Sequence, residues 1–311
     1  MKMPQADQLR TASATRDVSV QVQSILYMMD HESIEHALES LERAVDLAIG
    51  CGACSKIRVS YGDTSPQRCL SDEDLERMRE RFSYFELTYQ FFNANLGSAR
   101  GHNELSRYAD TDYLLILNPD IVVSPRIFEN LLEPFADPTI GMVEAKQLPI
   151  EHPKDYDPVT GETGWATTAC ALTPTPLFRE IDGFDADTFF LYCDDVDYSW
   201  RVREAGLKVI YAPNAVVFHD KRIAPDGAWQ PSRAERRYSA EAALLMAHKW
   251  SRPDIVEAIT ASFRAGNDDE RAALTKFEDM KAAGKLPQPR DHDNVIGDFI
   301  EGMYTKHRFA L

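Results

Sequence analysis

The residue types best suited to chemistry stand where apolar runs end. One such run, Tyr113–Leu117, is followed directly by Asn118, Pro119 and Asp120. A continuous apolar run without alternation is typical of a strand that is buried on both faces, as in parallel sheets. Because ligands of such sheets bind beyond the carboxyl ends of the strands, we expect Asp120 to carry a carboxylate into an active site.

Two later segments offer a base and a metal ligand. Asp194, Asp195 and Asp197 lie together at the start of a predicted helix, and the apolar run 216–218 ends in His219. Each feature also has an ordinary structural explanation. Asn-Pro-Asp is common in turns, acids at a helix N-terminus are favoured by the helix dipole, and a lone histidine is usually a satisfied core or surface residue.

The elements around these residues follow from the spacing of apolar side chains. Alternation or apolar runs predict strands, and steps of three and four predict helices. The first part of the chain reads as strand 18–27, helix 34–50, strand 57–61, a helix from Ser71, strand 85–91, helix 98–108 and strand 113–117. This order predicts an α/β fold with a doubly wound, largely parallel sheet.

Later segments are less regular. Helices are expected at 126–135, 174–181 and 195–205, and strands at 140–144, 169–172 and 209–211. The polar stretch 148–163 holds three prolines and predicts a loop of the kind that often forms a lid. Three regions follow: a flexible tail at 1–16, a main domain at 17–224, and a helical C-terminal extension at 225–311.

Composition limits the partners. Fifty acidic and thirty-four basic residues give a formal net charge of -16, which argues against nucleic acid. An anionic ligand is still compatible with this charge if a metal ion supplies local positive charge. No stretch approaches the roughly 20 apolar residues of a membrane span, and the start lacks a signal-peptide core, so a cytoplasmic protein is expected.

The cysteines allow two interpretations. Five cysteines without an export signal do not predict a disulfide framework. Cys51 and Cys54 form a C-x-x-C pair, which can bind zinc or act in redox chemistry, but no second pair completes four ligands. Small residues at a turn between a helix and a strand are the alternative.

Taken together, five segments resemble the family 2 glycosyltransferases, in particular the rhamnosyl- and galactofuranosyltransferase-like branch. They are 95–103 (NLGSARGHN), 112–120 (DYLLILNPD), 183–185 (GFD), 190–201 (FLYCDDVDYSWR) and 213–219 (PNAVVFH). The likeness covers about residues 18–219. It implies a GT-A fold with a doubly wound mixed sheet, and inverting transfer of a sugar from a nucleotide-diphosphate donor to a hydroxyl acceptor.

The resemblance implies a role for each chemical segment. Asn118 and Asp120 stand where the family carries its D-x-D metal motif, so Asp120 is expected to bind Mn²⁺ or Mg²⁺, with the amide of Asn118 in place of the first carboxylate. His219 would complete the metal site from the opposite side. Asp195 matches the family's general base, which accepts the proton of the acceptor hydroxyl.

The same resemblance implies contacts to the donor. Asp63 matches the strand-end acid that binds the nucleotide base. A turn and helix start beside the nucleotide and diphosphate would contribute Asn95, Gly97, Arg100 and Asn103. Gly164 and Trp165 would contact the donor sugar or the acceptor, although a core tryptophan is the alternative for Trp165.

The sequence thus predicts an inverting, metal-dependent hexosyltransferase that uses a UDP- or dTDP-sugar. The acceptor could be a glycan, a lipid-linked sugar or a protein, and the helical extension could shape an acceptor site or a homodimer interface. A metal-dependent phosphoesterase and a non-catalytic glycan-binding or scaffold protein are the alternatives. A sugar nucleotidyltransferase would need a basic Gly-rich loop after its first strand, and residues 28–31 offer none.

Overall fold

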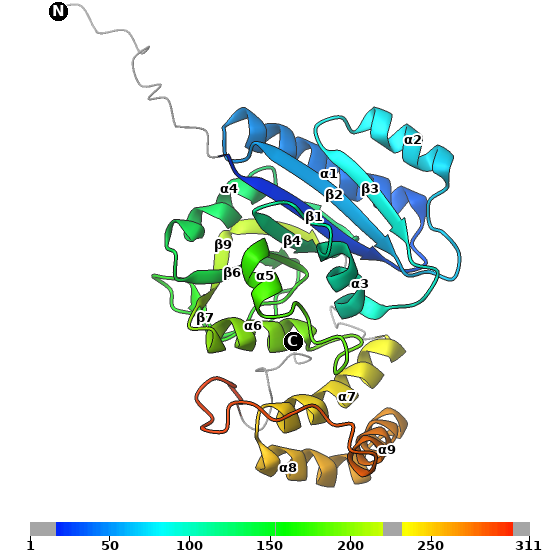
Figure 1. Ribbon diagram of the computed structural model, residues 1–311, viewed down its shortest axis with the longest axis vertical. Helices are drawn as coiled ribbons and strands as arrows, with labels where there is room; N and C mark the ends of the chain where they lie inside the picture. Colours follow the sequence, from blue (N-terminus) through cyan, green and yellow to red (C-terminus); the bar gives the residue numbers. More distant parts are fainter. Residues whose placement is uncertain (1–16, 153, 220–231, 301–311) are drawn as a thin grey trace, which may run out of the picture.

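The computed structural model describes residues 17–152, 154–219 and 232–300 (Figure 1). The predicted flexible tail 1–16 and the predicted boundary between 224 and 225 lie outside these residues. A mixed sheet forms the centre of the molecule, and a separate layer of three helices lies at one end. No helix in the described ranges combines the length and the apolar character needed to cross a bilayer.

The first half of the sheet is parallel, as the strand and helix order predicts. Strand β1 (Ser19–Leu26) pairs with β2 (Lys56–Asp63) on one side and with β4 (Tyr113–Leu117) on the other. The outer strand β3 (Glu86–Phe91) pairs with β2. These strands therefore end at a common edge, where Asp63 and Asn118 lie.

The second half makes the sheet mixed, which confirms the predicted fold class. Strand β8 (Cys170–Pro174) runs antiparallel between β4 and β6 (Ile140–Leu148). The long strand β9 (Lys208–His219) joins two predicted apolar segments and pairs with β6. Two short strands that the sequence pattern does not predict also pair with β9: β5 (Ile121–Val123) and β7 (Glu162–Thr163).

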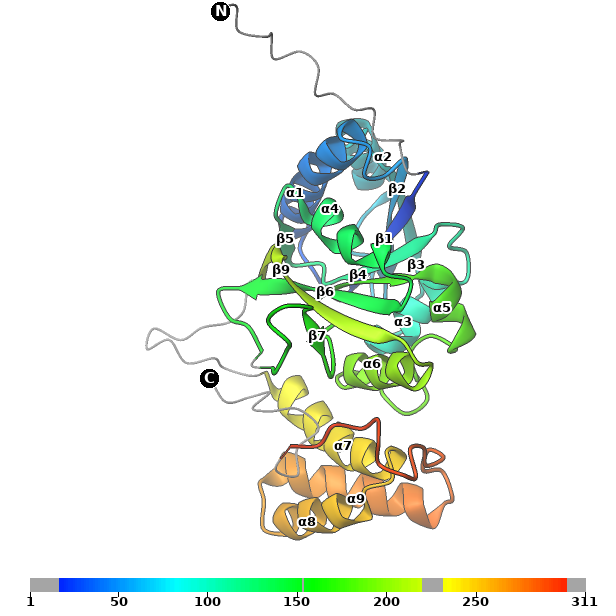
Figure 2. The same ribbon diagram turned by 90° about the vertical axis from the view of Figure 1, so that its left-hand side faces the viewer.

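Helices cover both faces of the sheet, as Figure 2 shows from the side. One apolar core lies between the sheet and α1 (His31–Gly50), α2 (Asp72–Arg81) and α4 (Ile127–Leu132). The other lies against α3 (Gly97–Ser106), α5 (Thr175–Glu180) and α6 (Asp194–Glu204). The helix that carries Asp195 is therefore fixed to the sheet by its buried face.

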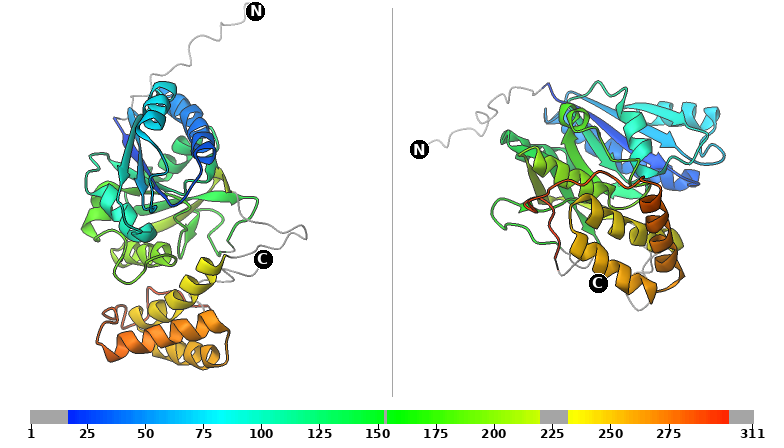
Figure 3. Two further views of the ribbon diagram at one scale, coloured as in Figure 1. Left: turned by 90° about the vertical axis from the view of Figure 1, so that its right-hand side faces the viewer. Right: turned by 60° about the horizontal axis from the view of Figure 1, so that its bottom comes forward.

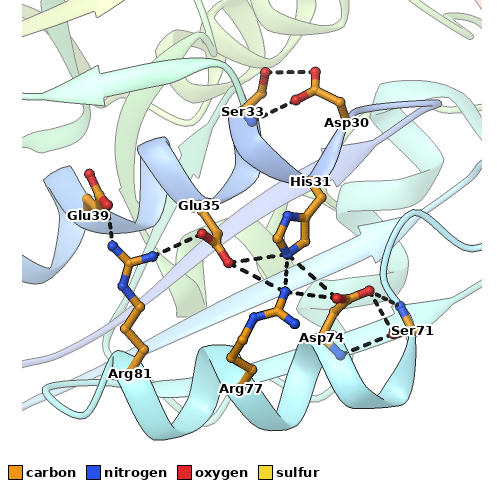
Figure 4. A network of polar contacts seen from close by, with 9 residues as sticks. All are labelled: Asp30, His31, Ser33, Glu35, Glu39, Ser71, Asp74, Arg77 and Arg81. Atoms are coloured by element: carbon orange, nitrogen blue, oxygen red, sulfur yellow. Dashed lines mark hydrogen bonds and ion pairs between the residues drawn. The ribbon is translucent and has the colours of Figure 1, made fainter.

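Polar contacts join α1 to α2 at the surface (Figure 4). Arg81 donates to Glu35 across the two helices at 2.9 Å, and the predicted start of α2 is a capping box formed by Ser71 and Asp74. The hydrogen bonds from Ser71 lower the pKa of Asp74 to about 2. Because these groups are partly exposed, each ion pair contributes little stability, but together they set the position of α2 on α1.

The C-terminal extension is helical, and Figure 3 shows its helices as one compact group. It consists of α7 (Arg233–Lys249), α8 (Pro253–Arg264) and α9 (Asp268–Ala282). A buried polar link joins it to the main domain at the end of α7. There Lys249 lies 2.6 Å from Asp197 of α6 and 2.6 Å from Asp185, while the Trp250 indole donates to Asp197 at 3.1 Å.

This link is buried, so we expect it to stabilise the fold strongly. Lys249→Met removes one charge and leaves the fully buried Asp197 short of a partner, which should lower the free energy of unfolding by about 3 kcal/mol. Arg68→Met removes an exposed ion pair to Asp72 and should cost less than about 1 kcal/mol. Chemical denaturation of both variants measures the difference, and equal costs would contradict the anchoring role of Lys249.

Candidate active site

The three residues predicted to hold a metal meet in the structure. Asp120 Oδ2 lies 3.5 Å from Nε2 of His219, and the amide nitrogen of Asn118 lies 3.5 Å from the same atom. The short strand β5 brings them together, because it pairs antiparallel with the end of β9 and sets Ile121 opposite His219. Residues about a hundred positions apart in sequence thus face each other across one strand pair.

This group has the chemistry of a divalent-metal site. A carboxylate oxygen, an amide oxygen and an imidazole nitrogen all suit Mn²⁺, whereas Mg²⁺ prefers the oxygens. Both Asp120 Oδ2 and a neutral Nε2 are acceptors, so a cation between them would relieve their repulsion. Among the described residues, no three His, Cys, Asp or Glu side chains cluster around one point, so further ligands would come from Asn118 and from a bound diphosphate.

The second ring nitrogen of His219 faces away from Asp120. Its Nδ1 lies 3.0 Å from Oε1 of Gln147, a fully buried residue on β6. Gln147 in turn donates to Thr167 at 2.7 Å. The orientation of the imidazole is therefore set by side chains behind it, as in many metal sites.

A strained turn presents the predicted base. Tyr192 and Cys193 have φ angles of 67° and 64°, in the left-handed region that residues other than glycine rarely adopt. Two such residues in succession immediately precede Asp194 and Asp195, which lie buried in the first turn of α6. Strain of this kind occurs most often at functional sites and persists only where the surrounding structure enforces it.

The start of α3 is part of what enforces this turn. Gly97 has a φ of +71°, and a β-carbon there would lie 2.2 Å from the carbonyl oxygen of Phe190. Only glycine allows this approach. Asn95 accepts from the Gly97 backbone N–H at 3.2 Å, so both predicted donor-binding residues lie beside the segment that leads to Asp195.

One short segment connects the group of Asn118, Asp120 and His219 to the predicted base. The Asn118 backbone N–H donates to Ala169 at 2.8 Å, and the Ala166 backbone N–H donates to Ser199 of α6 at 3.0 Å. Three residues of chain span at most about 11 Å. Since the Ser199 hydroxyl also donates to the carbonyl of Asp195 at 2.8 Å, the two chemical groups flank the same stretch of chain.

Two predicted donor contacts on α3 have protein partners. Arg100 forms an exposed ion pair with Asp187 at 2.6 Å. The amide of Asn103 is paired twice with the backbone of Phe184, donating at 2.7 Å and accepting at 2.9 Å. In this structure Asn103 therefore holds the Gly183–Asp185 turn against α3.

Asp63 is also fully engaged with the chain. It is buried at the end of β2 and accepts hydrogen bonds from the backbone of Ser65 at 2.9 Å, from that of Cys69 at 2.7 Å, and from the Tyr89 hydroxyl. Burial would raise its pKa, but these hydrogen bonds outweigh it and hold the pKa below the ordinary value. Asp63 is thus a carboxylate that shapes the loop after β2.

Gly164 and Trp165 lie beside α6. A β-carbon on Gly164 would lie 3.0 Å from Asp298, next to a shallow cavity of about 330 Å³. The Trp165 ring is buried, and the Lys154 ammonium stands 4.2 Å from its centroid. One face of the predicted sugar platform is therefore covered by the loop that follows β6.

The structure adds buried polar residues that the sequence patterns do not single out. Glu144 lies on β6, fully buried, with an ion pair to Lys154 and a hydrogen bond of 2.8 Å from Thr167. Burial raises the pKa of Glu144 to about 6, against the opposing effect of Lys154. The sequence did contain a signal for Glu144, because a carboxylate inside a strand that is predicted to be buried needs a polar partner.

The C-x-x-C pair lies at the turn after α1. All five cysteines are free, and Cys54 is buried. Burial raises the pKa of its thiol to about 12, which disfavours the reactive thiolate. Cys51 directly follows α1, so the interpretation as small residues at a helix-to-strand turn agrees with the structure.

Comparison with known proteins finds partial matches to glycosyltransferases. No family model matches the sequence. A segment of 65 residues is 35% identical to N-acetylglucosaminyl-diphospho-decaprenol L-rhamnosyltransferase of Mycobacterium tuberculosis and covers 21% of each chain. A second match, pre-mycofactocin glycosyltransferase of the same organism, is 27% identical over 145 residues, or 40% of this chain and 30% of that protein.

Solved structures match over more of the chain. GalNAc-T7 with UDP, GalNAc and Mn²⁺ aligns with 87% of this chain and 56% of its own, at a TM-score of 0.61 and 10% identity. The mannosyltransferase PcManGT of Pyrobaculum calidifontis, with GDP-Man and Mn²⁺, aligns with 86% of this chain and 81% of its own, at a TM-score of 0.52 and 17% identity. The chain has the GT-A glycosyltransferase fold. The predicted resemblance to family 2-like glycosyltransferases is thereby confirmed, while the aligned segments span less than a third of the curated relatives' lengths.

The contact between Gly97 and Phe190 can be tested by substitution. Gly97→Ala should lower the free energy of unfolding by about 1–3 kcal/mol more than Gly284→Ala, because overpacking adds to the cost of a left-handed backbone. Gly284 has a φ of +63° but no atom within 4 Å of a β-carbon, so it controls for the backbone effect alone. Chemical denaturation compares the two, and equal costs would mean that the turn before α6 does not depend on Gly97.

Proposed function

We propose that this protein is a metal-dependent, inverting glycosyltransferase that uses a UDP- or dTDP-sugar. The observation that carries the proposal is the meeting of Asn118, Asp120 and His219 at the end of the sheet. Hydrogen bonds of residues 166–169 connect this group to the helix of Asp195. The GT-A fold supports it, because the neighbouring structures contain nucleotides or nucleotide sugars with Mn²⁺.

In this proposal Asp120 and His219 hold the cation, with the amide oxygen of Asn118 beside them. A bound Mn²⁺ or Mg²⁺ would neutralise the negative charge that develops on the departing diphosphate. The cation is important for this neutralisation because the chain itself has a net charge of -16. The protein orients the two ligands: the pairing of β5 with β9 positions Asp120 beside His219, and Gln147 orients the imidazole of His219.

Asp195 is the proposed general base. Its carboxylate would accept the proton of the acceptor hydroxyl as that oxygen forms a bond to the anomeric carbon. The bond between the anomeric carbon and the diphosphate breaks at the same time, and the nucleoside diphosphate leaves with the electron pair. Attack from the face opposite the diphosphate inverts the anomeric configuration.

Among the remaining predicted residues, Asn95, Gly97 and Arg100 would bind the diphosphate of the donor. Asn95 and Gly97 lie at the helix start beside the strained turn, where backbone N–H groups favour phosphate oxygens. Arg100 could release Asp187, its exposed partner, for a phosphate. The acceptor is a glycan, a lipid-linked sugar or a protein, and the name of the rhamnosyltransferase relative is compatible with a lipid-diphosphate-linked sugar.

The role of Asp195 predicts a selective loss. Asp195→Asn should lower the rate of sugar transfer by roughly 10²–10⁴-fold, because the amide cannot accept the proton, while UDP binding with Mn²⁺ changes little. Asp268→Asn changes an exposed acid in the first turn of α9 and serves as the control. Equal loss of transfer and of UDP binding in Asp195→Asn would mean that this residue is structural.

The role of Asp120 predicts coupled binding. Asp120→Ala should weaken Mn²⁺ and UDP binding together, by about tenfold or more, because one charged ligand of the cation is lost. Calorimetry with UDP, with and without Mn²⁺, measures the coupling, and Asp46→Ala on the exposed side of α1 is the control. Unchanged affinity in Asp120→Ala would reject the metal assignment.

A further inference from the structure

A file of buried polar side chains lies behind His219. It begins with Gln147 of β6, continues to Thr167, and ends at the ion pair between Glu144 of β6 and Lys154. Gln147 and Glu144 are fully buried, Thr167 is 3% exposed, and the Lys154 side chain is 2% exposed. Burying this many polar groups is costly unless every donor meets an acceptor.

The strand geometry that assembles this file is unusual. Glu144 and Gln147 are three residues apart, a spacing that would place them on opposite faces of a regular strand. Both nevertheless reach Thr167, at 2.8 Å and 2.7 Å. Between these two residues the pairing of β6 with β9 is irregular, because the partners of Ala145 and Lys146 are Ala212 and Val216, with three extra residues on β9.

The ion pair fixes the direction of every hydrogen bond in the file. Lys154 can only donate and an ionised Glu144 can only accept, so the single hydrogen of the Thr167 hydroxyl points at Glu144. The Thr167 oxygen must then accept from the amide nitrogen of Gln147. The amide oxygen of Gln147 therefore faces Nδ1 of His219, at 3.0 Å, and Nδ1 must carry the ring hydrogen.

This direction leaves the other nitrogen as an acceptor on the side of the proposed metal ligands. With the hydrogen on Nδ1, the lone pair of Nε2 faces the Asn118 amide nitrogen, from which it accepts, and Asp120 Oδ2, both 3.5 Å away. A cation bound here would replace the Asn118 hydrogen at this lone pair. The opposite tautomer would place a hydrogen on Nε2 and block coordination. The nitrogen that binds a metal is generally decided by the hydrogen bond that the other nitrogen makes.

We propose that Glu144, Thr167 and Gln147 are positioning residues that hold His219 in its metal-binding tautomer, with Lys154 as the countercharge. This inference rests on the proposed metal role of His219. Because Lys154 belongs to the loop between β6 and β7, it also ties the position of that loop to the metal site. Partners of this kind typically change metal affinity by about 10–100-fold when they are removed.

Thr167→Val tests the file at its middle, because valine keeps the shape and loses the hydroxyl. In the metal-free protein, ¹⁵N NMR of the imidazoles should find His219 with its hydrogen on Nδ1, and Thr167→Val should convert it to a mixture of tautomers. His219→Gln identifies the signals. Mn²⁺ binding in the presence of UDP, measured by calorimetry, should weaken about tenfold in Thr167→Val.

Thr173→Val is the matched control. Thr173 is a buried threonine of β8 whose hydroxyl bonds to the Gly141 carbonyl and to the Tyr198 hydroxyl, each at 2.9 Å, outside the file. This variant should keep both the tautomer and the Mn²⁺ affinity. A general loss of packing would affect the two threonine variants alike, whereas the proposed file distinguishes them.

The double variant Glu144→Gln with Lys154→Met tests whether the ion pair sets the direction of the hydrogen bonds. An amide at 144 can donate as well as accept, so Thr167 no longer has a fixed orientation, and the tautomer should again become mixed. If wild-type His219 carries its hydrogen on Nε2, or if either the double variant or Thr167→Val keeps it on Nδ1, the inference is wrong.

These outcomes are separate from the failure of the proposed function. If His219→Gln binds Mn²⁺ and UDP as tightly as the wild type, His219 is not a ligand and the metal proposal is rejected. If His219→Gln weakens Mn²⁺ binding while Thr167→Val leaves the tautomer and the affinity unchanged, only the positioning file is rejected.

Discussion

The candidate site depends on the antiparallel pairing of β5 with the end of β9. Only three residue pairs form this ladder, yet its register sets His219 opposite Ile121, the residue that follows Asp120. A shift of one residue would turn every side chain of β5 to the other face of the sheet. The buried side chains of Ile121 and Val123 resist such a shift, so the packing of this strand and the geometry of the site are one constraint.

Three parts of the chain support the group of Asn118, Asp120 and His219. The sheet fixes Asn118 through β4, the segment around Ala166 and Ala169 ties it to α6, and the file from Gln147 to Lys154 orients the imidazole. Each support is buried, where hydrogen bonds are strong and unpaired groups are costly. The arrangement is therefore suited to holding ligands at fixed positions before a cation or a substrate is bound.

The helical extension is joined to the same region. Asp197, two residues after the proposed base, receives Arg201 from its own helix and Lys249 and Trp250 from the end of α7. The Trp200 and Trp250 rings also pack edge to face, with centroids 5.1 Å apart. The extension thus packs on α6, the helix that carries the proposed base.

The sequence by itself determined the order of most strands and helices, because apolar periodicity reflects burial directly. It also determined the GT-A resemblance and the three chemical segments around Asp120, Asp195 and His219. Tertiary structure alone decided the rest. The strand β5 has only three residues and carries no periodic signal, and the turn at Cys193 takes a conformation that its residue types do not indicate. Glu144 and Gln147, three residues apart on β6, both meet Thr167. These features depend on contacts between segments far apart in the chain, and local sequence patterns do not encode such contacts.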